Sequence, residues 1–189
     1  FLKQIKSCNP KIILTLKKFK EQFKNIQNEI RLVDFNEFKN MDATKRENEK
    51  SNISSLIYTS GTTSSPKGVP IKHENTIFTT KNIINILKYS NSDIDIIPLS
   101  LSHSFGLGCF HTALFVGSTL ILHKNTMNIL EVLNSIKNNN ATTFAAVPAT
   151  LTSLVNDFPE KFVEKCSGLR LIITNSTKVP EDTINKILK

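Results

Sequence analysis

The chain has 189 residues, of which 39% are hydrophobic and 21% are charged, and this is the composition of an ordinary globular protein. Its formal net charge is +8, but lysine and arginine are spread along the sequence instead of forming a basic stripe, which argues against nucleic-acid binding. Cys8, Cys109 and Cys166 are widely spaced. They indicate a reducing compartment, taken as the cytoplasm, with buried thiols and neither a disulfide framework nor a zinc site.

Short apolar runs of strand length alternate with stretches of helical spacing along the chain. Strands are predicted at residues 11–16, 30–35, 53–58, 94–99, 118–122, 142–147 and 169–174. The clearest helices are predicted at residues 73–88 and 128–137, and residues 40–52 form a hydrophilic, linker-like loop. This alternation predicts an α/β fold with a mostly parallel sheet flanked by helices on both faces.

Residues 96–123 contain no Asp, Glu, Lys or Arg. The run exceeds the roughly 20 residues that span a bilayer, so a membrane helix has to be considered. However, it contains Pro98, three glycines, three histidines and many hydroxyl side chains, which suit a lipid-facing helix poorly. We therefore predict a buried strand, a loop, a helix and a second strand, with no transmembrane segment.

Residues 58–69, YTSGTTSSPKGV, combine six Ser or Thr hydroxyls, two glycines and one lysine. They lie between a predicted strand and a predicted helix, so we interpret them as a strand-to-helix connection, where α/β proteins often hold anions. The hydroxyls, the backbone N–H groups and the Lys67 ammonium would together suit phosphate groups. The Walker A pattern does not fit, because Pro66 and Gly68 occupy positions that require Gly and Ser or Thr. A Ser/Thr/Gly-rich loop without a ligand is the alternative.

The same stretch resembles the signature loop of the AMP-forming adenylating enzymes, which include acyl-CoA synthetases, peptide-synthetase adenylation domains and luciferases. The family pattern is Tyr-Thr-Ser-Gly-Thr-Thr-Gly-x-Pro-Lys-Gly-Val. The chain departs from it at Ser64, where the family has a third glycine. If this position needs a positive φ, serine adds backbone strain there.

Later segments resemble the family in the same order. Residues 98–107, 113–114 and 117–122 are similar to its substrate-pocket segment, and residues 142–149 to the strand and Val-Pro turn that follow. Residues 169–177 lie where the family has a Leu-Arg strand ending in Gly-Gly-Ala, but the chain has Asn-Ser-Thr at the last three positions. The resemblance covers the whole chain and is weakest before Ile53.

The resemblance implies that a carboxylate attacks the α-phosphate of ATP, giving an acyl-adenylate and pyrophosphate. The acyl group would then pass to CoA or to the phosphopantetheine of a carrier protein, and Mg²⁺ would arrive with ATP. Lys67 would be catalytic, without any metal site built from protein side chains. ATP binding is assigned by resemblance to Thr59, Ser60, Gly61, Thr62, Thr63, Ser64, Lys67 and Gly68. Acid binding is assigned to His103, Ser104, Phe105, Asn175, Ser176 and Thr177.

Amino-acid-activating members of the family carry Phe-Asp where this chain has His103 and Ser104. Because Ser104 has no charge to pair with a substrate ammonium, we expect a fatty, aryl or other non-amino acid. The apolar side chains of Phe110 and Leu114 are expected deeper in the pocket. The alternative is a nucleotide-binding or scaffold module that does not catalyse, given Ser64 and the altered residues 175–177.

Residues 1–189 are thus expected to form part of the large N-terminal domain of an AMP-forming ligase. The family's Tyr-Gly-x-Thr-Glu motif, its ribose-binding Asp and its small C-terminal domain with a catalytic lysine are absent from these residues. We therefore expect no turnover from residues 1–189 alone.

Overall fold

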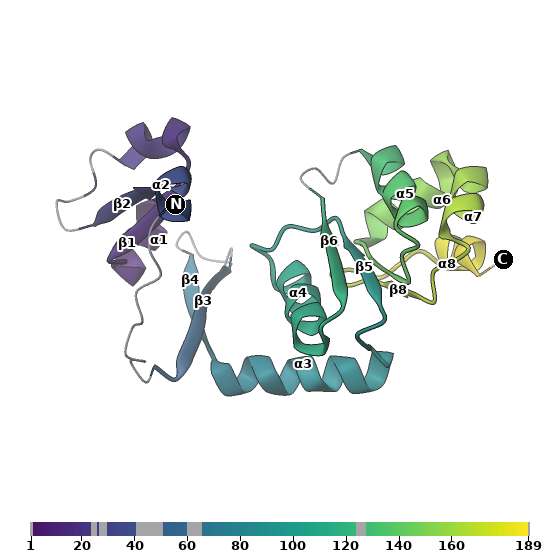
Figure 1. Cartoon of the computed structure of the whole chain (residues 1–189), viewed down its shortest axis with the longest axis horizontal. Coiled ribbons are helices and arrows are strands. Elements are labelled where there is room, and N and C mark those ends of the chain that lie inside the picture. The colour runs from purple at the N-terminus through teal and green to yellow at the C-terminus, as the bar shows by residue number, and fades with distance from the viewer. Residues whose placement is uncertain are drawn as a thin grey trace. The chain divides into compact units, whose positions relative to one another are not determined.

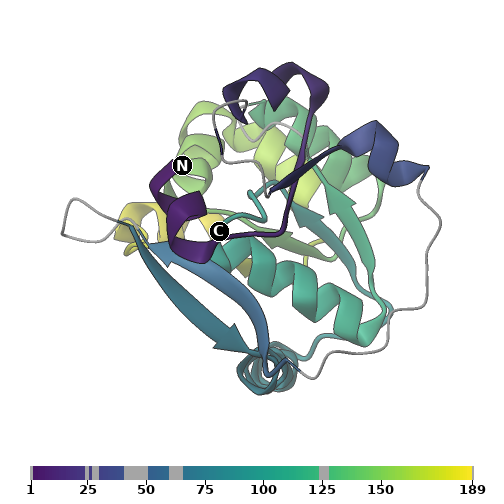
Figure 2. The same cartoon turned by 90° about the vertical axis from the view of Figure 1, so that its left-hand side faces the viewer.

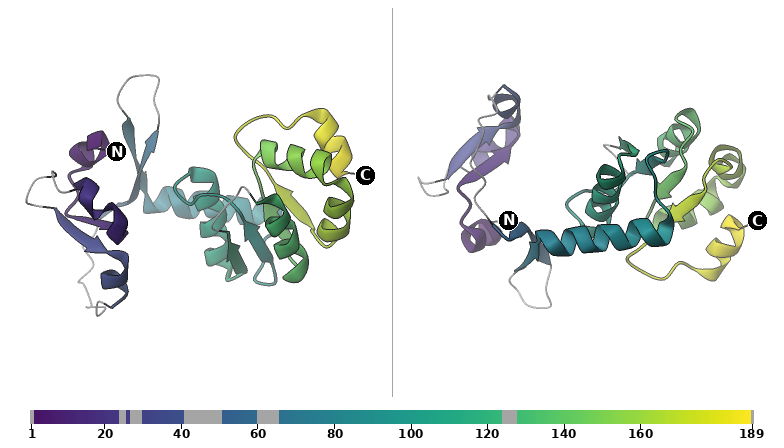
Figure 3. Two further views of the ribbon diagram at one scale, coloured as in Figure 1. Left: turned by 90° about the horizontal axis from the view of Figure 1, so that it is seen from above. Right: turned by 60° about the horizontal axis from the view of Figure 1, so that its bottom comes forward.

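The structure is a computed structural model that describes residues 2–23, 26, 30–40, 51–59, 66–123 and 128–188. The chain divides into two units, Phe1–Glu74 and Asn75–Lys189, and helix α3 (His73–Leu87) carries the chain from one to the other. Figure 3 shows α3 as a continuous helix. Within the described ranges, no helix is long and apolar enough to cross a membrane.

The first unit begins with a small α/β element. Its elements are α1 (Leu2–Cys8), β1 (Ile12–Thr15), a 3₁₀ helix η1 (Lys17–Phe23), β2 (Arg31–Asp34) and α2 (Phe35–Lys39). Strands β1 and β2 pair in parallel. Helix α2 starts with a capping box, in which the Asp34 carboxylate accepts the Asn36 N–H at 2.8 Å and Glu37 accepts the Asp34 N–H. Cys8 is exposed, so the prediction that all three thiols are buried is wrong for this residue, which ends a short helix of this small unit.

The second part of this unit is an antiparallel hairpin of β3 (Ile53–Thr59) and β4 (Lys67–Lys72) (Figure 2). The donor-rich stretch therefore joins two strands, and its interpretation as a strand-to-helix connection is wrong. The strand was missed because β4 contains Gly68 and Pro70, two residue types that are depleted in strands. Proline is tolerated here because the strand lies at a sheet edge.

The second unit contains a four-stranded parallel sheet with the order β6-β5-β7-β8. Its strands are β5 (Ile94–Ile97), β6 (Thr119–Leu122), β7 (Thr143–Ala145) and β8 (Leu171–Ile173). Its helices after α3 are α4 (Ser104–Val116), α5 (Ile129–Asn138), α6 (Pro148–Asp157), α7 (Pro159–Cys166) and α8 (Glu181–Ile187). The predicted α/β class with a parallel sheet is confirmed, and so is the reading of residues 96–123 as strand, loop, helix and strand.

Successive residues of the central strands contribute to opposite faces of the sheet, as the period of two requires. Ile96 and Phe144 belong to a large core formed with α5, α6 and α7. Their neighbours Ile97 and Ala145 belong to a smaller core with Cys109 of α4. Figure 1 shows α4 on one face of the sheet and α5, α6 and α7 on the other.

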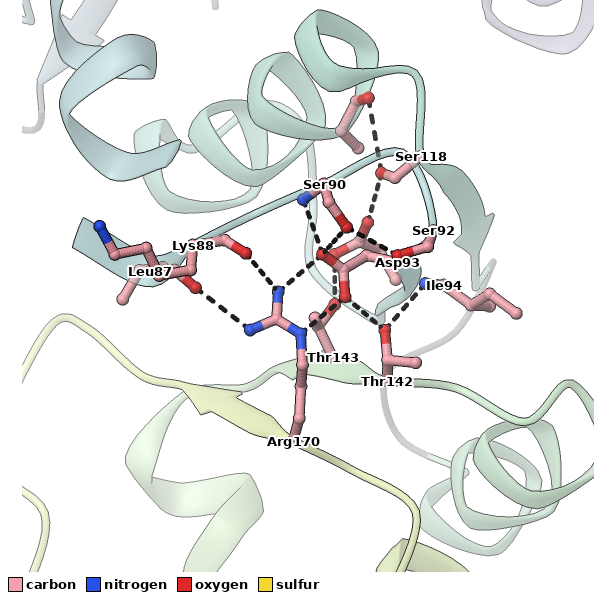
Figure 4. A network of polar contacts seen from close by, with 12 residues as sticks. Leu87, Lys88, Ser90, Ser92, Asp93, Ile94, Ser118, Thr142, Thr143 and Arg170 are labelled. Atoms are coloured by element: carbon pink, nitrogen blue, oxygen red, sulfur yellow. Dashed lines mark hydrogen bonds and ion pairs between the residues drawn. The ribbon is translucent and has the colours of Figure 1, made fainter. Parts of the chain in front are cut away.

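An ion pair ties the amino-terminal ends of three strands to the end of α3 (Figure 4). The Arg170 guanidinium donates from Nε and Nη2 to the two carboxylate oxygens of Asp93 at 2.7 and 2.6 Å. It also donates to the carbonyl oxygens of Leu87 and Lys88, both at 3.2 Å. The Thr142 hydroxyl donates to Asp93 at 2.8 Å. The hydrogen bond from Arg170 is the largest cause that lowers the pKa of the Asp93 carboxyl to about 2.

Gly106 allows the start of α4 to pack against the turn that precedes it. A Cβ at this position would lie 2.6 Å from the Ser100 carbonyl oxygen, whereas a Cβ at Gly108 of the same helix would have nothing within 4 Å. We expect Gly106→Ala to destabilise the protein by about 1–3 kcal/mol through overpacking. Gly108→Ala should instead stabilise it by roughly 0.5–1 kcal/mol, because alanine favours a helix interior. Urea denaturation of both variants checks this, and equal stabilities would contradict the close packing.

Candidate functional site

The hairpin places two of the predicted ATP-binding residues opposite each other. Thr59 ends β3 and pairs in register with Lys67, which begins β4, and both are exposed. No ion pair links the Lys67 ammonium to a carboxylate of the described segments. Ser60, Gly61, Thr62, Thr63 and Ser64 lie outside the described residues.

Tyr58, near the loop end of this hairpin, links β3 to α1 within the first unit. Its hydroxyl donates to the Gln4 carbonyl oxygen of α1 at 3.2 Å. Gly68 lies opposite Tyr58 in the ladder, and a Cβ there would approach the Leu56 and Tyr58 side chains to 3.2 Å. Glycine at this position thus leaves room for both side chains beside the start of β4.

The predicted acid-binding residues follow two strands of the parallel sheet. Ser104 begins α4, seven residues beyond the end of β5, and Asn175 lies two residues beyond the end of β8. The carboxyl ends of parallel strands share one edge of a sheet, and small molecules commonly bind in the crevice outside that edge.

A cavity of about 330 Å³ lies between α3, α4 and β8 within the second unit. Residues of α3 and the segment after it, of α4, and of the end of β8 form its wall. The lining residues are Thr79, Ile83, Leu87, Tyr89, Ser104, Phe105, Gly108, Cys109, Thr112, Ile173, Thr174 and Asn175. The size suits a small organic molecule.

Three of the six predicted acid-binding residues, Ser104, Phe105 and Asn175, line this cavity together. The other three do not. His103 is exposed just before α4, and its carbonyl oxygen accepts the Leu107 N–H at 3.0 Å. Ser176 is exposed, and Thr177 lines a separate hollow beside α6.

The face of α4 that lines the cavity differs from the one predicted. Leu114 was expected deep in the pocket, but its side chain is 62% exposed, and Phe110 is not a lining residue. Phe105, Cys109 and Thr112 line the cavity instead, at the spacing of one helix face. The prediction was wrong because α4 is apolar on nearly all sides, so its hydrophobic pattern selects no face.

The contribution of α3 to the cavity was also not predicted from the sequence pattern. Ile83 and Leu87 lie one turn apart on α3 and line the wall, and Tyr89 follows the helix. Their spacing of four residues marks one side of a helix, but the same spacing is found wherever a helix packs on a core.

Among the described residues, those that line the cavity carry no charged side chain. Burial raises the pKa of the Cys109 thiol to about 12, so this thiol is protonated at neutral pH and is a poor nucleophile. Burial also raises the pKa of Tyr89, which therefore stays neutral. The Thr112 hydroxyl donates to the Gly108 carbonyl oxygen at 2.9 Å within its own helix. This wall can therefore bind a ligand through its shape and through neutral hydrogen-bonding groups.

Ser176 has a backbone φ of +96°, in the left-handed region that favours glycine. The preceding Asn175 stabilises this turn, because its side-chain oxygen accepts the Ser176 N–H at 2.6 Å. With its oxygen engaged, the Asn175 amide has its NH₂ group available as a donor at the cavity wall.

Ser176→Gly is expected to raise the free energy of unfolding by about 1 kcal/mol, because glycine adopts this φ without steric strain. Ser167→Gly is the matched control. Ser167 has a φ of −57°, so glycine there should cost about 0.5–1 kcal/mol. Thermal or urea denaturation of the two variants measures the difference. A loss of stability in Ser176→Gly would contradict the strain.

The fold and the cavity together indicate the broad class of protein to which this chain belongs. A parallel α/β domain that holds a cavity at the carboxyl ends of its strands belongs to the large group of α/β proteins that bind small molecules there. The profile of one family, described as AMP-binding enzyme, matches residues 2–189. The chain therefore belongs to the AMP-binding enzyme family.

Individual relatives agree with this assignment. A 2-succinylbenzoate–CoA ligase of Bacillus licheniformis is 30% identical over 182 residues, which are 94% of this chain and 37% of the ligase. An indoleacetate–CoA ligase of Aromatoleum aromaticum is 32% identical over 133 residues, 70% of this chain and 26% of that ligase. The structure of o-succinylbenzoate coenzyme A synthetase from Bacillus subtilis in complex with AMP matches with a TM-score of 0.83 and 25% identity. The match covers 98% of this chain and 38% of the synthetase chain. The chain thus spans between 26% and 38% of the length of these relatives.

Proposed function

We propose that the full-length protein containing this chain is an acid–thiol ligase that forms an acyl-adenylate. The observation that carries the proposal is the uncharged cavity at the carboxyl edge of the sheet in a chain of the AMP-binding enzyme family. Residues 1–189 would form part of the N-terminal domain of such a ligase, in keeping with the length of the relatives.

In the proposed reaction, a carboxylate oxygen of the acid attacks the α-phosphorus of ATP. The new bond gives the mixed anhydride of the acid and AMP, and the bond to the β-phosphate breaks to release pyrophosphate. Reactions of this kind depend on positioning and charge neutralisation more than on proton transfer. Lys67, Thr59 and the donors of residues 60–64 would hold the β- and γ-phosphates, and Mg²⁺ would accompany them on ATP.

The cavity wall supports a non-amino acid as the substrate. An α-ammonium held beside Ser104 and Asn175 would have no carboxylate among the lining residues, and leaving a buried charge unpaired is costly. An alkyl or aryl tail would instead gain about 0.8 kcal/mol for each buried CH₂ group. Ser104 and the Asn175 amide would lie near the reacting carboxylate, with the tail directed toward Ile83 and Leu87.

The second half-reaction would transfer the acyl group to a thiol, with AMP as the leaving group. CoA is the acceptor supported by the names of the relatives, and the phosphopantetheine of a carrier protein has the same thiol chemistry. We place the protein in the cytoplasm, since Cys8, Cys109 and Cys166 are all free.

Acid-dependent exchange of labelled pyrophosphate into ATP by the full-length protein tests this proposal. Plain alkyl and aryl acids should each support exchange better than α-amino acids of matched side-chain size. Absence of exchange with every acid, together with retained binding of ATP, would instead identify a nucleotide-binding module that does not catalyse. Better exchange with an α-amino acid than with every plain acid would overturn the proposed substrate class.

A further inference from the structure

We infer that the acid is a monocarboxylate with an uncharged tail, because a buried aspartate, Asp95, lies behind the deep end of the cavity and disfavours a second carboxylate there. This inference rests on the proposed function and narrows its substrate class. It also separates this chain from its relative that acts on 2-succinylbenzoate, an acid with two carboxyl groups.

The cavity is lined at one side by the last residue of β8, Ile173, and at the other by Leu87 and Tyr89, which precede β5. Asn175 follows the carboxyl end of β8 and lines the cavity. Leu87 also lines the cavity. Its carbonyl oxygen accepts a hydrogen bond from the guanidinium of Arg170, which immediately precedes β8. An acid with its carboxylate near Asn175 therefore directs its tail toward Leu87 and Tyr89.

Asp95 lies on the side of the sheet that faces this cavity. Its strand neighbour on that face is Ile97, which belongs to the same small core as the lining residue Cys109. Asp95 pairs in register with Thr143, whose hydroxyl donates to the carboxylate. The row that contains Asp95 is nearer the amino ends of the strands than the row of Ile97. The substrate tail would lie at the level of the Asp95 row.

Asp95 is only 1% exposed, so water screens its charge poorly. The second oxygen of the carboxylate accepts the Ser118 hydroxyl at 2.6 Å. Among the described residues, no salt bridge is formed by this carboxylate. Arg170 is the cation of this region, and it is bound by both oxygens of Asp93. Arg170 also interacts electrostatically with Asp95, but its guanidinium is bound by both oxygens of Asp93. One cation therefore faces two carboxylates beside the lining residues Tyr89 and Cys109.

The charge of Asp95 affects the pKa values of two lining residues. Burial is the main cause that raises the pKa of both Tyr89 and Cys109, and the negative charge of Asp95 raises both further. A carboxylate at the end of a substrate tail would meet the same field and would also lose its hydration. An alkyl or aryl end would lose nothing by comparison.

The first test compares three acids of equal length in the pyrophosphate exchange of the full-length wild-type protein. Octanoate ends in a methyl group, the monoamide of octanedioate in a neutral polar group, and octanedioate in a second carboxylate. We expect kcat/KM for octanedioate to be at least about tenfold below both others, and tenfold corresponds to about 1.4 kcal/mol. Octanedioate used as well as octanoate would overturn the inference. Absence of exchange with these acids and with every other acid of the panel would instead refute the proposed function.

The second test isolates Asp95. Asp95→Asn keeps the shape and removes the charge, and it should raise the ratio of octanedioate to octanoate activity by about tenfold. Thr143→Val is the matched control, since it removes a hydrogen bond to Asp95 without changing any charge, and its ratio should stay near that of the wild type. An unchanged ratio in folded Asp95→Asn protein would overturn the role of Asp95. The comparison of acids uses wild-type protein, so it decides the substrate class even if this variant does not fold.

Discussion

Asp93→Asn is expected to lower the free energy of unfolding of the full-length protein by about 3 kcal/mol, the lower end of the range for breaking a buried ion pair. Asp93 is almost fully buried, while the Arg170 side chain is 38% exposed and can be rehydrated in part. The variant replaces one carboxylate oxygen by an amide NH₂ group that faces the guanidinium. It therefore weakens the link between β5, β8 and the end of α3.

The pH dependence of this effect has a definite sign. The pKa of Asp93 falls from its ordinary 3.8 to about 2 in the folded protein, so folding favours the ionised carboxylate. The stabilisation is complete above pH 4 and is lost as the pH falls through about 2. A shift of this size corresponds to about 2.5 kcal/mol. The difference in stability between wild type and Asp93→Asn should therefore shrink between pH 4 and pH 2.

Asp182→Asn provides a control for charge removal alone. It breaks the ion pair of Asp182 with Lys186 on α8, where the two side chains are 74% and 43% exposed. Exposed pairs one helical turn apart contribute only about 0.3–0.5 kcal/mol, so this variant should be nearly as stable as the wild type. Equal losses in Asp93→Asn and Asp182→Asn, measured by urea denaturation at neutral pH, would show that the buried pair has no special role.

Lys67→Ala is expected to slow adenylate formation by about 10- to 100-fold, because a charge-assisted contact to phosphate contributes roughly 1.5–3 kcal/mol. Lys67 is exposed at the start of β4, so the hairpin should keep its fold without this ammonium. Pyrophosphate exchange of the full-length variant at saturating acid measures the loss.

Lys72→Ala is the matched control for Lys67→Ala. Lys72 is also an exposed lysine of β4, at the other end of the strand, and its ammonium is 3.1 Å from Glu74. Its removal changes the net charge by the same amount, so a general effect of charge on ATP attraction would lower both activities equally. Equal activities in the two variants would remove Lys67 from the proposed phosphate site.

The fold was largely predictable because short apolar strands alternate with helices in the second unit. Ile96 and Phe144 are fully buried, and such residues make strands that sequence patterns identify well. Strand β4 was not predictable in the same way. Gly68 and Pro70 obscure it, and only pairing with β3 makes it a strand.

The candidate site was predictable only in part. Ser104, Phe105 and Asn175 were found by resemblance to known motifs, and the structure brings them to one cavity. Tyr89 and Cys109 were not predicted as site residues, since they reach the cavity through packing between elements distant in sequence. Asp95 was missed for the same reason, because its burial depends on Thr143 and Ser118 in neighbouring elements.

Direct detection of the intermediate tests the central claim most plainly. The full-length protein, incubated with ATP, Mg²⁺ and octanoate but no thiol, should yield octanoyl-AMP by mass spectrometry, with one pyrophosphate released for each adenylate formed. Addition of CoA or a carrier protein should convert the adenylate to the thioester and AMP. Formation of ADP and phosphate, or binding of ATP without any adenylate from this or other plain acids, would contradict the proposed ligase.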